Sequence, residues 1–344
     1  MRLGVLDIGS NTVHLLLVDA HPGARPVPFA SHKRPLSLVQ YLDGDGNITD
    51  AGQHELAEFV LEAWEFAARH KADDLLAFCT SAIREATNGP AVLARVKYET
   101  TVTLQELTGS EEASMTFFAV RRWYGWGAGP VLNLDIGGGS FEMAFGQDEL
   151  PEVATSAPLG ASRLTRDWLA EDPPSAKSVK ELRRYIRSTL APAVNKFEGL
   201  GRANLVAGTS KTFRSLARIA GAAPSAAGPY VKRELNATDL GVWAQRISAM
   251  KVEDRLFLPG VSDARAHQLL AGALVAEAAL EMFKFKKMRI CPWALREGLI
   301  LRRLDQLVFA GPLDPAPHVR LGAPGGPGGP EPSPAPEAVL PSAG

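Results

Sequence analysis

The amino-acid sequence predicts an α/β protein made of two similar domains that face each other across a cleft. The main observation is a short element that occurs once in each half, at residues 3–18 and 131–145. Each copy is an apolar run ending in Asp-Ile-Gly, followed by small residues and a second apolar run. Apolar runs bounded by turn residues are typical of strands, so each copy predicts a hairpin. The length of 344 residues is sufficient for two domains with their own cores.

The residues at the two hairpin turns are suited to binding phosphate. Glycine lets backbone N–H groups approach a ligand closely and adopt positive φ, and successive N–H groups in such a turn bind anions. Hydroxyl and amide side chains add further donors. The candidate phosphate-binding residues of the turns are Gly9, Ser10, Asn11, Thr12, Gly137, Gly138, Gly139 and Ser140. No lysine follows the glycines and no helix begins there, so the turns are not P-loops.

An aspartate ends the first strand of each hairpin, Asp7 in one half and Asp135 in the other. Carboxylate oxygens are the ligands that Mg²⁺ and Mn²⁺ prefer. A phosphate-binding turn beside a metal-binding carboxylate is the minimum that a phosphoryl-transfer site requires. A single Asp-X-Gly turn is usually only a hairpin, but two copies with the same flanks favour a shared function.

The composition is that of an ordinary soluble protein. Apolar residues make up 46% and charged residues 22% of the chain, and the net charge of −1 favours neither nucleic acid nor a membrane surface as a partner. Cys79 and Cys291 lie in apolar stretches without metal-ligand spacing, which is typical of reduced core cysteines. The N-terminus does not have the pattern of a signal peptide, and no stretch has the length of a membrane span. We therefore expect a cytoplasmic protein.

The remaining elements of the first half follow from periodicity and turn signals. Residues 21–50 predict further strands and a turn at 43–47, and Thr49 and Asp50 can cap a helix. The predicted elements after that cap are a helix over 51–70, a buried strand over 75–79, a short helix over 90–99, a strand over 102–107 and a helix that Ser110 caps and that continues through Trp123.

Two features of this half have both a functional and a structural interpretation. Arg84 follows the strand over 75–79, at the edge where open α/β sheets place ligands, so it is either a phosphate contact or a surface ion pair. Glu111 and Glu112 lie in the first turn of the next helix. Acids there usually complement the helix dipole, and the functional alternative is that one of them acts as a general base.

The second half contains an anion-binding signal and a basic helix. The strand over 205–207 leads through Thr209 and Lys211 into a helix, and a strand, a small polar loop and a helix N-terminus favour an anion. A helix over 175–190 carries five cations, which form either a solvated face or a track for a polyanion. The other predicted elements are a loop over 158–164, helices over 238–250, 262–283 and 294–304, a strand over 288–291 and a disordered Pro/Gly-rich tail over 311–344.

Seven motifs in order resemble those of the exopolyphosphatase and guanosine pentaphosphate phosphohydrolase (Ppx/GppA) family. The similarity runs from residue 1 to about residue 305 and is strongest to the short actinobacterial exopolyphosphatase-like members. The motifs are Asp-Ile-Gly-Ser-Asn-Thr at 7–12, Thr-Ser-Ala-Ile-Arg at 80–84, Gly-Ser-Glu-Glu-Ala at 109–113, Asp-Ile-Gly-Gly-Gly-Ser at 135–140 with Glu142, Pro-Leu-Gly at 158–160, Gly-Thr-Ser-Lys-Thr at 208–212 and Ala-Leu-Arg-Glu-Gly at 294–298.

The resemblance implies the actin-like ATPase fold, in which two ribonuclease-H-like domains enclose a cleft. It implies a first domain over 1–125, a second domain over 126–310 and a C-terminal helix over 294–305 that packs back on the first domain. The family also often forms homodimers, although no surface stripe in the sequence indicates one.

The resemblance also implies an activity and the residues that perform it. The family removes the terminal phosphate of inorganic polyphosphate, or the 5′ γ-phosphate of guanosine pentaphosphate, with Mg²⁺ or Mn²⁺. By motif position, Glu112 activates water and Arg84 contacts phosphate together with the two turns. Asp135, Glu142 and Asp7 match the residues that hold metal and orient water.

Four functions therefore remain open from the sequence. The first is an exopolyphosphatase and the second a guanosine pentaphosphate phosphohydrolase. The third is a kinase of the same fold, which would need a phosphate acceptor, and the fourth is a polyphosphate or alarmone sensor without catalysis. The pairing of Glu112 with Asp135 and Glu142 favours an enzyme. Longer family members carry helical domains that grip a long polymer, and the present resemblance does not include them, so the sequence leaves the preferred polymer length open.

Overall fold

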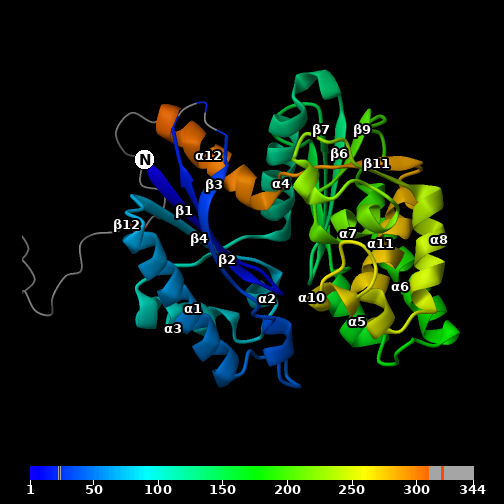
Figure 1. The fold of residues 1–344 in the computed structure, drawn as a ribbon, viewed down its shortest axis with the longest axis horizontal. Helices are drawn as coiled ribbons and strands as arrows, with labels where there is room; N and C mark the ends of the chain where they lie inside the picture. The colour runs from blue at the N-terminus through cyan, green and yellow to red at the C-terminus, as the bar shows by residue number, and fades with distance from the viewer. Residues whose placement is uncertain (22, 24, 310–318, 321–344) are drawn as a thin grey trace, which may run out of the picture.

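The computed structural model describes all residues except 22, 24, 310–318 and 321–344, and it contains two sheets of the same topology (Figure 1). In the first sheet β1 (Arg2–Ile8), β2 (Val13–Asp19) and β3 (Pro28–Arg34) are antiparallel neighbours, and β4 (Asp74–Cys79) runs parallel to β1. This repetition confirms the predicted duplicated α/β fold of the actin-like type. The strands of the second sheet follow the same order: β6 (Val131–Ile136), β7 (Phe141–Gly146), β8 (Val153–Ala157) and, parallel to β6, β9 (Leu205–Gly208).

Short strands and helices complete the two halves. The short strands are β5 (Gln105–Glu106), β10 (Glu234–Asn236), β11 (Lys287–Ile290) and β12 (Val319–Arg320). The helices are α1 (Asp50–Arg69), α2 (Ser81–Arg84), α3 (Gly89–Thr100), α4 (Gly109–Tyr124), α5 (Ala161–Trp168), α6 (Ala176–Asn195), α7 (Lys211–Ile219), α8 (Ala237–Ser248), α9 (Val252–Arg255), α10 (Asp263–Ala266), α11 (Leu269–Met282) and α12 (Leu295–Phe309).

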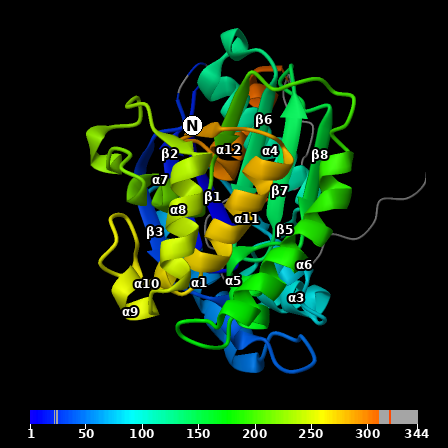
Figure 2. The same cartoon turned by 90° about the vertical axis from the view of Figure 1, so that its right-hand side faces the viewer.

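Each sheet is covered by helices on both faces, which explains why its central strands are almost entirely apolar. Helix α1 packs on β2 and β3, whereas α12 contacts β1 from the other side. In the second sheet α11 contacts β6 and lies between α6 and α8, and α4 covers β6, β7 and β8 from the opposite face (Figure 2). Helices α4 and α12 also pack on each other, so they join the two halves.

The predicted domain boundary at residue 125 remains a prediction. Helix α4 precedes that residue, yet its packing partners are strands of the second sheet and α12. Gly298 of α12 lies so close to α4 that an added Cβ would overlap the carbonyl of Met115. The predicted tail over 311–344 lies outside the described residues except for β12, which pairs antiparallel with β4. No helix in the described part of the chain is long and apolar enough to cross a bilayer.

The structure corrects several local predictions. The N-cap of α4 is Thr108 and not Ser110, because the Thr108 hydroxyl accepts from the Glu111 N–H and the Glu111 carboxylate accepts from the Thr108 N–H at 2.8 Å. The strand predicted over 102–107 is limited to β5, and the loop predicted over 158–164 already contains the start of α5. The helix predicted over 262–283 is interrupted between α10 and α11.

Candidate active site

The two hairpin turns meet at a cavity of about 190 Å³ between the halves. Asp7 and Asp135 both line this cavity, together with Glu112. The other predicted site residues that line it are Gly9, Ser10, Asn11, Thr12, Gly137, Gly138, Ser140, Glu142, Thr209 and Lys211. Arg84 and Gly139 lie just behind its wall, where Arg84 binds Glu112 and Gly139 packs on Ser81. The structure thus brings the predicted residues to one place.

The two turns have the same geometry. The N–H of Gly9 donates to the carbonyl of Thr12 at 3.1 Å, and that of Gly137 donates to the carbonyl of Ser140 at 2.9 Å. None of these turn glycines adopts a positive φ, so the expected backbone freedom is not what the site requires of them. A Cβ on Gly138 would lie 2.9 Å from the side chains of Ser10 and Asn11, which shows that the turns are in direct contact.

The second turn is held by the start of α5. The backbone N–H groups of Ala161, Ser162 and Arg163 donate to the carbonyls of Gly137 and Gly138 at 2.9–3.0 Å. These donors would otherwise be unpaired at a helix start. The hydrogen bonds therefore fix the carbonyls of the second turn on the start of α5.

Hydrogen bonds also connect the first turn with the second half of the chain. The Asn11 amide donates to Gln268 at 3.2 Å. The Ser162 hydroxyl lies 2.6 Å from Gln268 Oε1 and 3.0 Å from Asn11 Oδ1, and its single proton is donated to one of these two oxygens. Gln268 lies between α10 and α11, where the predicted long helix is interrupted. These contacts hold the two turns in register across the cavity.

Four carboxylates surround the cavity, and burial raises the pKa of each. The pKa of Asp135 is raised to about 6, and that of Glu112 to about 7, because burial disfavours their charged forms and the neighbouring carboxylates repel them. Glu142 pairs with Asp135 in the β6–β7 ladder, and burial and the Glu112 charge raise its pKa well above the usual value. Such a cluster is stabilised by a cation.

Hydrogen bonds orient three of the four carboxylates. The Arg84 guanidinium donates to Glu112 at 2.5 Å and also to the carbonyl of Leu107, so it joins the end of the first sheet to α4. The Ser156 hydroxyl donates to Glu142 at 2.9 Å, and the Thr209 hydroxyl donates to Asp135 at 2.5 Å. Arg84 is therefore a partner of Glu112, and its predicted contact with phosphate remains a prediction.

Cations also line the cavity, close to the carboxylates. Besides Lys211, these are Arg214 of α7, Arg265 of α10 and Arg296 of α12. Burial and the neighbouring arginines lower the pKa of Lys211 to about 8. Arg296 lies 3.8 Å from the Asp7 carboxylate and donates to Nδ1 of His14. Burial and the surrounding cations lower the pKa of His14 to about 3, so this histidine is neutral and can accept the bond.

The sequence did not single out Arg265 or Arg296 as site residues. Arg296 belongs to the motif at 294–298, but nothing in the spacing shows that α12 carries it to Asp7. Arg265 lies in the short helix α10, where the sequence shows no recognisable motif. Both arrive at the cavity through the packing of distant segments.

The cavity has the donor chemistry for a divalent metal ion but not a complete protein cage. Within the described ranges, no three His, Cys, Asp or Glu side chains are gathered closely enough to hold one ion. Mg²⁺ is usually held by one or two carboxylates together with substrate phosphates and water. Acids beside the two turns fit that arrangement, and both the phosphate-binding residues and the metal ligands remain predictions.

Two matching turns around a carboxylate cluster, in a duplicated actin-like fold, define an enzyme that acts on phosphate compounds. Residues 17–307 match the Ppx/GppA phosphatase family, and the chain belongs to this family. It is 54% identical over 306 residues to a Mycobacterium tuberculosis protein named Exopolyphosphatase 1, with 89% of each chain covered. The protein of that name from Mycobacterium leprae is 52% identical over 305 residues, covering 89% of this chain and 90% of the relative.

A solved structure confirms the fold independently of these relatives. The structure of an exopolyphosphatase from Cytophaga hutchinsonii superimposes with a TM-score of 0.79 at 24% identity. The match covers 89% of the present chain and 98% of that structure. The arrangement of the two halves is thus shared with that exopolyphosphatase.

Proposed function

We propose that the protein is a metal-dependent exopolyphosphatase, which hydrolyses the terminal phosphoanhydride bond of inorganic polyphosphate and releases orthophosphate. The observation that carries the proposal is the position of Glu112, a buried carboxyl group that faces two phosphate-binding turns from α4. Membership of the Ppx/GppA phosphatase family supports a phosphoanhydride hydrolase. The name of the relatives that are 54% and 52% identical supports polyphosphate as the substrate over guanosine pentaphosphate.

Each group of residues around the cavity has a separate role in the proposed reaction. Backbone N–H groups of the two turns, with Thr12 and Ser140, hold the terminal phosphates. Glu112 accepts a proton from a water molecule, whose oxygen attacks the terminal phosphorus while the bridging P–O bond breaks. Orthophosphate leaves, and the shortened chain keeps the bridging oxygen. Asp135 and Glu142 would hold a divalent ion, which supplies positive charge to the reacting phosphate.

Arg84 and Arg296 have supporting roles in this proposal. Arg84 donates to Glu112 and so fixes the carboxylate on the side of the turns. Arg296 lies near Asp7 and compensates part of the negative charge of the cluster. Because neutral His14 accepts a hydrogen bond from Arg296, the guanidinium is held toward the cavity and not toward solvent.

The function is tested by measuring orthophosphate release from short and long inorganic polyphosphate and from guanosine pentaphosphate, with Mg²⁺, with Mn²⁺ and with a chelator. We expect release from inorganic polyphosphate that the chelator abolishes and Mg²⁺ restores, because the carboxylate cluster needs a cation. Faster release from guanosine pentaphosphate would favour the phosphohydrolase. Tight binding without turnover for every substrate and metal would overturn the proposed enzymatic activity and favour a non-catalytic sensor.

The raised pKa of Glu112 predicts the pH dependence of the reaction. A general base must be ionised, and burial raises the pKa of this carboxyl to about 7. The value of kcat/KM should therefore be low in acid and rise as Glu112 ionises, with a midpoint at or below about pH 7 because bound Mg²⁺ favours the carboxylate. A profile at constant free Mg²⁺ between about pH 5.5 and 8.5 reports this ionisation in the free enzyme. A flat profile over that range would contradict the assignment.

The proposal places the enzyme in the cytoplasm. This is supported by the two cysteines, Cys79 and Cys291, which are buried and free in the structure, and burial raises the pKa of each thiol. Buried thiols with raised pKa values are poorly reactive, which is compatible with a reducing compartment. A homodimer remains a prediction.

A further inference from the structure

Arg163 of α5 binds both halves of the molecule at the second turn. Its Nε donates to the carbonyl of Gly139 at 2.8 Å, and its Nη2 forms an ion pair with the Glu85 carboxylate. Gly139 belongs to the second turn, whereas Glu85 follows α2 in the first half. Among the described residues, no other ion pair joins residues 1–108 with residues 126–290. We call the Glu85–Arg163 ion pair the latch.

The latch lies beside helix α2, which makes two further contacts at the candidate active site. Ser81 at the start of α2 packs on the second turn, since a Cβ on Gly139 would lie 2.5 Å from the Ser81 hydroxyl oxygen. The same hydroxyl oxygen lies 3.0 Å from that of Ser10 in the first turn. Arg84 at the end of α2 donates to Glu112. Helix α2 thus contacts both turns and the proposed base, and the latch ties it to the second turn.

The backbone of Arg163 fixes the start of its side chain. The Arg163 N–H donates to the carbonyl of Gly138 at 3.0 Å, one residue before the carbonyl that its Nε binds. The Arg163 side chain is 26% exposed and that of Glu85 is 35% exposed, so water screens their attraction less than on an open surface. A guanidinium that is already held by the turn needs little further ordering to bind the carboxylate.

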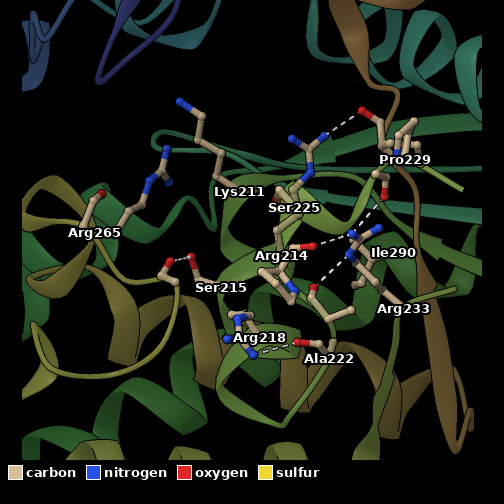
Figure 3. A pocket seen from close by; sticks show the side chains of 16 residues that line it. Lys211, Arg214, Ser215, Arg218, Ala222, Ser225, Pro229, Arg233, Arg265 and Ile290 are labelled. Atoms are coloured by element: carbon tan, nitrogen blue, oxygen red, sulfur yellow. Dashed lines mark hydrogen bonds between the residues drawn. The ribbon is translucent and has the colours of Figure 1, made fainter. Parts of the chain in front are cut away.

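Other arginines of the second half make their bonds within that half. Arg183 of the basic helix α6 forms an ion pair with Glu277 of α11. Figure 3 shows the cavity beside α7, where Arg218 donates to the carbonyl of Ala222 at 2.9 Å. These bonds stabilise the second half alone, whereas Arg163 joins it to the first half.

We propose that Arg163 is a positioning residue for the reaction: through Glu85 it holds the second turn on α2, and so sets the position of the bound phosphate relative to Glu112. This inference rests on the proposed function. Each turn keeps its own backbone hydrogen bond without the latch, so phosphate can still bind. Hydrolysis requires in addition that the activated water lies in line with the phosphorus, and small displacements of a catalytic group lower the rate steeply. Loss of the latch should therefore lower kcat more than it raises KM.

The test is the steady-state kinetics of the full-length Arg163→Gln and Glu85→Gln variants and of the double variant, with inorganic polyphosphate and Mg²⁺. We expect Arg163→Gln to lower kcat by about tenfold and Glu85→Gln by about threefold or more, with a smaller change in KM. The double variant should be no slower than the slower single variant, because one interaction can be removed only once. The control is Arg166→Gln, which removes the same charge from the same helix. Arg166 pairs with the adjacent Asp167, so kcat should not change.

Hydrogen exchange followed by mass spectrometry gives a second measurement, which does not need activity. Residues 81–85 and 137–140 should exchange faster in both single variants than in the wild-type protein, because the latch no longer holds these segments together. If Arg163→Gln does not fold, Glu85→Gln tests the latch from the first half.

Three results would overturn the inference. The first is a wild-type kcat for Arg163→Gln, even with a lower melting temperature, since the residue would then be structural only. The second is a double variant in which the two rate losses multiply, since the two side chains would then act independently. The third is wild-type hydrogen exchange in both single variants. Absence of orthophosphate release by the wild-type protein would overturn the proposed function instead, and hydrogen exchange would still decide whether the latch exists.

Discussion

Replacing Glu112 with Gln is expected to lower the rate of orthophosphate release by about 10²–10⁴-fold, which is the range for loss of a general base. Gln has the same shape and its carbonyl oxygen can still accept a hydrogen bond from Arg84, which donates to Glu112 at 2.5 Å. The fold and the affinity for polyphosphate should therefore be retained. Phosphate release is measured under single-turnover conditions, and binding is measured by titration of labelled polyphosphate.

The adjacent glutamate provides a matched control. Glu111 belongs to the capping box of α4 with Thr108, and Gln serves equally well at that position of a capping box. Glu111→Gln should consequently keep both activity and stability. If the Glu112→Gln variant released orthophosphate at the wild-type rate, another group would have to activate the water. A loss of binding as large as the loss of rate would show that Glu112 holds substrate and is not the base.

Replacing Gly160 with Ala is expected to reduce kcat/KM by about 10²-fold, the cost of displacing a catalytic group by about 1 Å. A Cβ on Gly160 would overlap backbone atoms of Gly138 and Gly139, and backbone cannot move aside as a flexible side chain can. The second turn would have to shift against Ser10 and Asn11, although Gly160 itself is not assigned to the substrate. The free energy of unfolding should also fall, by about 1–3 kcal/mol, as is usual for overpacking.

The control for this variant is Gly127→Ala. An added Cβ at Gly127 meets no heavy atom within 4 Å, so neither activity nor melting temperature should change. Activity is measured by phosphate release, and the melting temperature is measured by thermal unfolding followed by circular dichroism. Wild-type kcat/KM together with an unchanged melting temperature for Gly160→Ala would show that the turn tolerates the displacement, and that its position is not critical.

The sequence alone was sufficient for the features that depend on local chemistry. The two Asp-Ile-Gly turns were visible because a strand, a turn and a strand are adjacent in the chain, and their repetition predicted the duplicated sheet. Thr49 was identified as the cap of α1 for the same reason, and its hydroxyl accepts from the N–H of Gly52. The cap of α4 was misplaced because Thr108 and Ser110 are both suitable residues, and only the bond between Thr108 and Glu111 distinguishes them.

The sequence identified the glycines of the turns correctly, but the structure gives a different reason for them. The sequence indicated backbone freedom as their purpose. In the structure Gly138 and Gly139 have ordinary φ values and are needed because Ser10, Asn11 and Ser81 lie against them. That proximity joins segments that are far apart in the sequence, so no local pattern could reveal it.

The sequence by itself determined the fold class, the family and the residues of the two turns, since these follow from short motifs and their order. Only the tertiary structure decided which charges meet: Glu112 with Arg84, and Asp7 with Arg296. The physical reason is that electrostatic interactions depend on distance and burial. Both quantities are set by how α4, α7, α10 and α12 pack on the two sheets, and not by their positions along the chain.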